Sequence, residues 1–148
     1  DAQYRQALAL DPNCASAHLN LAVAAVQAGD LAGAESHYRR ALPGRPTAET
    51  HNGLGFVLAR QGRADEAIAE FRKAITADPK FTPAYNNLAE ALARLGKLED
   101  AADYYRRSLA ERPNPAVHNA LGGILRQLGR ADEAELQFSK AKALQFAR

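Results

Sequence analysis

Apolar residues in this chain recur every three or four positions, in short runs that glycine and proline separate. This spacing places the apolar side chains on one face of a helix. Between residues 48 and 81, Gly62 divides two such runs, at a point where helices often end in a left-handed residue. Pro79 follows the second run and disfavours helical geometry in the residue before it. The segment therefore predicts a helix, a tight turn and a second helix. Its apolar positions are Leu54, Val57, Leu58, Ala64, Ala67, Ile68, Phe71, Ala74 and Ile75.

The same pattern is repeated along the chain. The dividing glycines are separated by 33, 34 and 33 residues, and a small residue, an aromatic residue and a proline keep nearly the same steps. A fixed period of this length indicates a repeat architecture. The four series are Gly29, Gly62, Gly96 and Gly129; Ala34, Ala67, Ala101 and Ala134; Tyr38, Phe71, Tyr105 and Phe138; and Pro12, Pro46, Pro79 and Pro113.

These series predict an all-α chain of nine helices in a single array. Pro43 should end a helix early in the first full repeat, whereas residues 143–146 should prolong the last helix. The array consists of a half repeat that supplies only a second helix, at 1–14, followed by repeats at 15–47, 48–81, 82–114 and 115–148.

Composition supports a helical protein that neither binds nucleic acid nor inserts into a membrane. Ala, Leu, Glu, Arg, Lys and Gln dominate, which are helix-forming residues. The 19 basic and 17 acidic residues are interspersed, so no basic footprint for nucleic acid is present. No apolar run is long enough to span a membrane. Cys14 is the only cysteine, which fits a reducing compartment and favours the cytoplasm. The chain opens inside a helical pattern without Met, and we interpret it as a fragment.

The repeat resembles the tetratricopeptide repeat, a 34-residue antiparallel helix pair. Besides the small and aromatic positions above, the family's Leu and its small neighbour match Leu21-Ala22, Leu54-Gly55, Leu88-Ala89 and Leu121-Gly122, and its second small residue matches Ala41, Ala74, Ser108 and Ala141. The resemblance implies a right-handed superhelical solenoid that acts as a binding scaffold, with no enzymatic activity and no cofactor.

Several side chains invite a chemical interpretation. His18, His51 and His118 could serve as metal ligands or bases, but they recur at one place in different repeats, and packed helices lie about 8–10 Å apart. Packing is the favoured interpretation, and His37 is treated as isolated. We therefore expect no metal site and no catalytic residue. The acidic pairs Asp65-Glu66, Glu99-Asp100 and Asp132-Glu133 fall in predicted first turns, where they favour the helix dipole.

The resemblance implies that a peptide or partner protein binds in a concave groove lined by the first helix of each repeat. Asparagine both donates and accepts, so a series of asparagines can pair with a peptide backbone; equally, these residues can be solvated surface. The arginines can pair with an acidic ligand or complement helix C-termini. The expected groove residues are Asn20, Asn52, Phe56, Arg60, Asn86, Asn87, Glu90, Arg94, Asn119 and Arg126.

Two other functions stay open at this point. Because each repeat buries its apolar faces only against its neighbours, the ends of an array can pair and drive self-assembly. Alternatively, the array recruits substrate for a larger bacterial-type transferase. RNA binding expects a basic groove, which the near-neutral charge disfavours.

Overall fold

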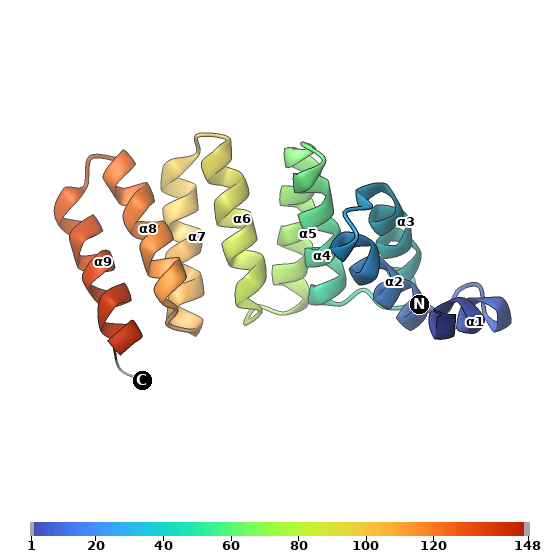
Figure 1. The fold of residues 1–148 in the computed structure, drawn as a ribbon. Coiled ribbons are helices and arrows are strands. Elements are labelled where there is room, and N and C mark those ends of the chain that lie inside the picture. Colours follow the sequence, from blue (N-terminus) through green and yellow to red (C-terminus); the bar gives the residue numbers. More distant parts are fainter. Residues whose placement is uncertain (1, 147–148) are drawn as a thin grey trace. The chain divides into compact units, whose positions relative to one another are not determined.

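The computed structural model describes residues 2–146, without the side chains of residues 2, 5 and 8. The chain divides into two compact units, Asp1–Pro79 and Lys80–Arg148, here called unit 1 and unit 2. Over the described range every regular element is a helix (Figure 1). Unit 1 contains α1 (Ala2–Leu10), α2 (Ala15–Gln27), α3 (Leu31–Ala41), α4 (Ala48–Arg60) and α5 (Ala64–Ala77), and unit 2 contains α6 (Thr82–Arg94), α7 (Leu98–Glu111), α8 (Pro115–Gln127) and α9 (Ala131–Phe146).

Helices α2 to α9 form four hairpins, each joined by a turn with a left-handed glycine. The φ angle is 81° at Gly62, and the amides of Gly62 and Arg63 donate to the carbonyl oxygens of Ala59 (3.1 Å) and Leu58 (3.0 Å). These bonds satisfy carbonyl groups that the end of α4 leaves free. Gly29, Gly96 and Gly129 have φ angles between 74° and 77°, so the predicted glycine turns are confirmed.

The lengths of α3 and α9 agree with the prediction from the sequence, and polar side chains cap the starts of α3 and α8. Helix α3 has 11 residues and ends two residues before Pro43, whereas α5 has 14 and α9 has 16. The carboxylate of Asp30 accepts from the amide of Gly33 at 2.9 Å at the start of α3, and the side chain of Asn114 accepts from the amide of Ala116 at 2.8 Å at the start of α8. Such caps stabilise a helix by about 1 kcal/mol each.

Rings from three second helices, α3, α5 and α9, fill the space beside a glycine of a first helix. A Cβ added to Gly55 would lie 2.6 Å from Cε1 of Phe71, and one added to Gly122 would lie 2.6 Å from Cε1 of Phe138. Tyr38 packs differently. Its ring lies against Gly53 of the next first helix, where an added Cβ would be 2.4 Å from Cζ.

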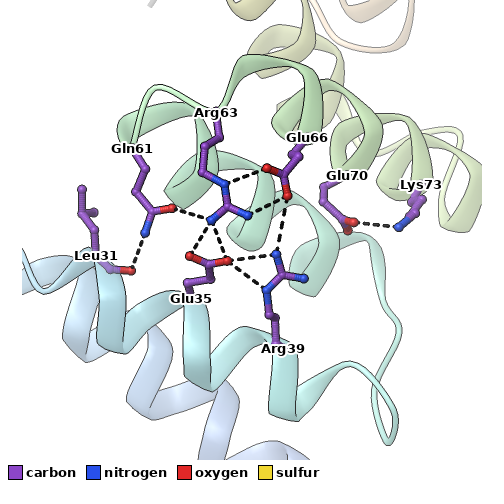
Figure 2. Close-up of polar contacts among 8 residues, drawn as sticks. All are labelled: Leu31, Glu35, Arg39, Gln61, Arg63, Glu66, Glu70 and Lys73. Atoms are coloured by element: carbon purple, nitrogen blue, oxygen red, sulfur yellow. Dashed lines mark hydrogen bonds and ion pairs between the residues drawn. The ribbon is translucent and has the colours of Figure 1, made fainter.

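Charged residues connect successive hairpins within each unit. Figure 2 shows the cluster in unit 1, where Arg63 contacts Glu35 at 2.8 Å and Glu66 at 2.6 Å, and Arg39 contacts Glu35 at 2.9 Å. Unit 2 repeats the arrangement, with Arg130 on Glu99 and Glu133 and with Arg106 on Glu133. These acidic residues lie in first turns, as predicted, except Glu35, and they also form ion pairs that the sequence does not reveal.

Candidate functional site

The exposed side of the first helices of unit 1 presents a mixed polar and apolar surface. Helices α2 and α4 contact each other. Val23 is 44% exposed and Phe56 is 36% exposed, although most large apolar side chains of α4 are buried. We call this surface the unit 1 face; it comprises Asn20, Val23, Asn52, Phe56 and Arg60.

Arg60 lies over the ring of Phe56, with its guanidinium carbon 5.8 Å from the ring centroid. The two residues are one helical turn apart, so their side chains are neighbours on α4. Among the described residues Arg60 has no carboxylate partner within ion-pair distance. The face therefore exposes a cation held by an aromatic ring.

In unit 2 the arginines of the first helices already have partners. Glu90 and Arg94 of α6 form an ion pair at 2.6 Å. Asn86 is half-buried, and its Oδ1 atom is buried without a hydrogen-bond partner in the described residues. On α8, Asn119 is exposed, and Arg126 lies 5.8 Å from the ring centroid of Phe138 on α9. Arg126 is thus directed toward its own hairpin.

The packing of Tyr38 explains why α4 has a glycine at a place where α2 and α6 have an asparagine. Asn20 and Asn87 occupy one place in their repeats, and Gly53 occupies the same place in the repeat between them. Since the ring of Tyr38 fills the space where a side chain at 53 would begin, an asparagine there would displace a buried ring. Of the adjacent positions 52 and 53 on α4, only position 52 therefore contributes a side-chain amide to the unit 1 face.

The histidines belong to contacts that close each hairpin. A residue in the first turns of the first helix meets a residue 19 positions later on the second helix. The pairs are His18–His37 with Nδ1 atoms 3.0 Å apart, His51–Glu70 at 2.7 Å, Tyr85–Tyr104 with ring centroids 6.4 Å apart, and His118–Gln137 at 2.8 Å. The interpretation of His37 as isolated is therefore wrong, because the hairpin brings it to His18.

The hydrogen bonds of His18 determine the direction of the His18–His37 contact. Nε2 of His18 donates to the carbonyl oxygen of Pro12 at 3.0 Å, which leaves its Nδ1 to accept from Nδ1–H of His37. Burial lowers the pKa of His37, and the neighbouring His18 and Arg40 lower it further, while Asp30 opposes them. A proton added to His37 would enter at its Nε2 atom and place a positive charge on a half-buried ring near Arg40.

We expect unit 1 to lose stability as the pH falls below about 6.5, the value for histidine in an unfolded chain. Because folding lowers the pKa of His37, the unfolded chain takes up this proton first, so the stabilisation is complete above that value and is lost below it. Urea unfolding across this range should show a smaller pH dependence for His37→Gln, whose amide can still donate to His18. His118→Gln is the control, and equal slopes for wild type and His37→Gln would contradict the assignment.

Glu70 titrates in a different window and does not obscure this effect. Burial alone would raise the pKa of its carboxyl group, but hydrogen bonds from Lys73 and His51 outweigh burial and lower it. Its contribution to stability is present above the unfolded value of about 4.3 and is lost only as the pH falls further.

Neither a multidentate metal cluster nor a membrane span occurs in the part of the chain that the structure describes. No three His, Cys, Asp or Glu residues there are grouped closely enough to hold a metal ion. None of the described helices is both long and apolar enough to cross a membrane. Cys14 precedes α2 and is half-buried.

Comparisons with known proteins agree with the repeat geometry. Two family models described as tetratricopeptide repeat match residues 1–49 and 58–124, which together make up most of the chain. No curated protein matches at a significant level. A crystal structure of MamA has a TM-score of 0.89 at 22% identity and covers 95% of this chain and 83% of that one.

Two further solved structures are also similar. A structure from the functional characterization of Pseudomonas aeruginosa pilF has a TM-score of 0.86 at 27% identity, covering 95% of this chain and 65% of that one. YrrB, described as a TPR protein with an unusual peptide-binding site, has a TM-score of 0.81 at 22% identity, with 97% and 75% covered. The chain belongs to the tetratricopeptide repeat family and has its all-α solenoid fold.

Proposed function

We propose that the chain is a protein-interaction scaffold that binds a peptide or partner protein on the surfaces of its first helices, α2, α4, α6 and α8. The observation that carries this proposal is the unit 1 face, where Val23 and Phe56 remain exposed beside the polar Asn20 and Arg60. Exposed apolar side chains among hydrogen-bonding groups are typical of sites that bind proteins. The similarity to YrrB, described as having a peptide-binding site, supports the same kind of ligand.

The second helices offer less to a ligand where their charged groups already have partners. Glu35, Glu66 and Arg39 are held together around Arg63, and Glu133 is held by Arg130 and Arg106. A ligand would have to displace these ion pairs. On the first helices, by contrast, Asn20 and Asn119 are exposed and can donate to and accept from a peptide backbone.

Binding of this kind needs no chemical step. Apolar contact with Val23 and Phe56 would supply about 25 cal/mol for each Å² removed from water, and amide contacts would fix the direction of the peptide. The proposal assigns no catalytic residue, metal or cofactor.

Self-assembly through α9 receives less support. At the place where α5 and α7 carry Ile75 and Leu109, α9 carries the exposed Lys142. Burying a lysine without a partner is costly, so this side of α9 is poorly suited to a second copy of the chain, even though Leu136 and Phe146 are exposed on the same helix.

Peptide arrays probed with labelled protein test the proposal. We expect the wild type to bind a subset of peptides. The triple variant Asn20→Ala, Asn52→Ala, Asn119→Ala should bind them about fivefold more weakly for each hydrogen bond to the peptide that the substitutions remove. The matched control changes exposed second-helix residues, Ser36→Ala and Ser139→Ala. An equal decrease in affinity for both variants, or amide NMR shifts confined to second helices on peptide addition, would reject the first helices as the binding surface.

A further inference from the structure

The pairs Phe56–Arg60 and Glu90–Arg94 occupy the same places on α4 and α6, 34 residues apart. On α6 the arginine obtains a carboxylate from its own helix, with a separation of 2.6 Å. On α4 a phenylalanine stands where that glutamate would be, and the guanidinium lies over its ring. The charge of Arg94 is thus neutralised within α6, whereas the charge of Arg60 remains available to a ligand.

The position of Arg60 near the end of its helix does not account for this difference. A cation there favours the negative end of the helix dipole, but Arg94 has the same position and still forms an ion pair. The interaction of Arg60 with the helix dipole therefore does not prevent Arg60 from binding a carboxylate. A guanidinium stacked on a ring keeps its donors in one plane, which suits a bidentate contact with a carboxylate.

The surroundings of Arg60 point to an apolar group next to that carboxylate. Phe56 and Val23 hold equivalent places on α4 and α2, and both are exposed. The corresponding residues of unit 2 are Glu90 and Gly123, so an exposed apolar pair at these places is confined to unit 1. Glu49, exposed in the first turn of α4, would repel an acidic group at the opposite end of the helix.

We propose that the unit 1 face selects acidic peptide segments in which a bulky apolar side chain lies close to a carboxylate. The carboxylate pairs with Arg60, the apolar side chain packs on Val23 and Phe56, and Asn20 and Asn52 contact the peptide backbone. This inference rests on the proposed function and adds the chemistry of the ligand. It also sets a direction, since the acidic group lies toward the C-terminal end of α4.

Fluorescence anisotropy with matched short peptides tests this selectivity. One set carries a fixed Phe or Leu followed within four residues by Glu, and the other set has Gln in place of Glu. We expect the wild type to bind the Glu peptides about tenfold more tightly, the effect of a charge-assisted hydrogen bond. The preference should weaken as salt is added, because the site is exposed.

Two variants and one control identify the residues responsible. Arg60→Gln removes the cation, and Phe56→Glu builds into α4 the ion pair that α6 already has. Both should abolish the preference for Glu peptides. Arg72→Gln, which changes an exposed arginine on the second helix α5, should retain it. Since Phe56 and Arg60 are exposed, all three variants should keep the helical circular dichroism of the wild type.

A failure of the proposed selectivity can be distinguished from a failure of the proposed function. If the wild type binds Glu and Gln peptides equally, or if Arg60→Gln keeps the preference, the selectivity is overturned while peptide binding by the first helices stands. If no peptide perturbs α2, α4, α6 or α8, the proposed function itself fails.

Discussion

Replacing Phe71 with alanine is expected to lower the free energy of unfolding by about 3–5 kcal/mol. The ring is 1% exposed and is the largest fully buried side chain in the described residues. It packs against Gly55 across the α4–α5 hairpin, and with only a glycine on that side, little can move in to fill the cavity. Urea unfolding followed by far-UV circular dichroism measures the change.

Phe56→Ala is the matched control, because Phe56 is an aromatic residue of the same hairpin that remains 36% exposed. It should cost about 1 kcal/mol or less, as is usual for surface positions. Similar losses for the two variants would show that the ring of Phe71 does not carry the packing of the hairpin.

Gly55→Ala is expected to cost about 1–3 kcal/mol through overpacking, although alanine is otherwise the better helix former. The new Cβ would lie 2.6 Å from Cε1 of Phe71 and 3.2 Å from the carbonyl oxygen of Ala67. The ring is buried and the carbonyl belongs to the backbone of α5, so neither can give way easily. Pairing Gly55→Ala with Phe71→Leu should recover part of the loss.

Gly123→Ala, in contrast to Gly55→Ala, is not expected to destabilise the protein. Gly123 also lies inside a first helix, α8, but apart from the neighbouring backbone of that helix no atom lies within 4 Å of an added Cβ. The substitution should leave stability unchanged or raise it by up to about 1 kcal/mol. A loss in Gly123→Ala as large as that in Gly55→Ala would contradict the packing explanation.

Local rules explain why so much of the fold could be predicted from the sequence. Helix ends depend on glycine and proline, which act within a few residues. The same signals occur in each of the four full repeats, so each repeat supports the prediction for the others. The short α3 before Pro43 and the long α9 both follow from such local signals. The repeat boundaries at 15, 48, 82 and 115 remain predictions, as does the assignment of groove residues.

Contacts across a hairpin were harder to predict, because they depend on register. The separation of 19 residues between His18 and His37 is not a helical spacing, so periodicity within one helix could not reveal it. Comparison of the repeats could have done so, since every full repeat has a ring at the first place and a polar or aromatic residue 19 positions later. The ion pairs of Arg63 and Arg130 likewise link residues 28 and 31 positions apart.

The burial of side chains on the first helices also escaped sequence reasoning. Asn86 and Asn119 hold equivalent places, yet Asn86 is half-buried and Asn119 is exposed. The rings of the second helices also differ in which glycine they contact. Phe71 and Phe138 lie against a glycine of their own first helix, whereas Tyr38 lies against Gly53 of the next one.

Three of the four hairpin-closing pairs contain histidines that can serve as natural spectroscopic probes. His18 bonds to an imidazole, His51 to a carboxylate and His118 to an amide, so their imidazole nitrogen and carbon resonances should be resolved from one another without any labelling at chosen sites. The α6–α7 hairpin has Tyr85 and Tyr104 at these places instead, so the histidine resonances report on the other three hairpins. Opening of these three hairpins could therefore be followed separately in one sample, which would show directly whether the repeats melt together or in succession.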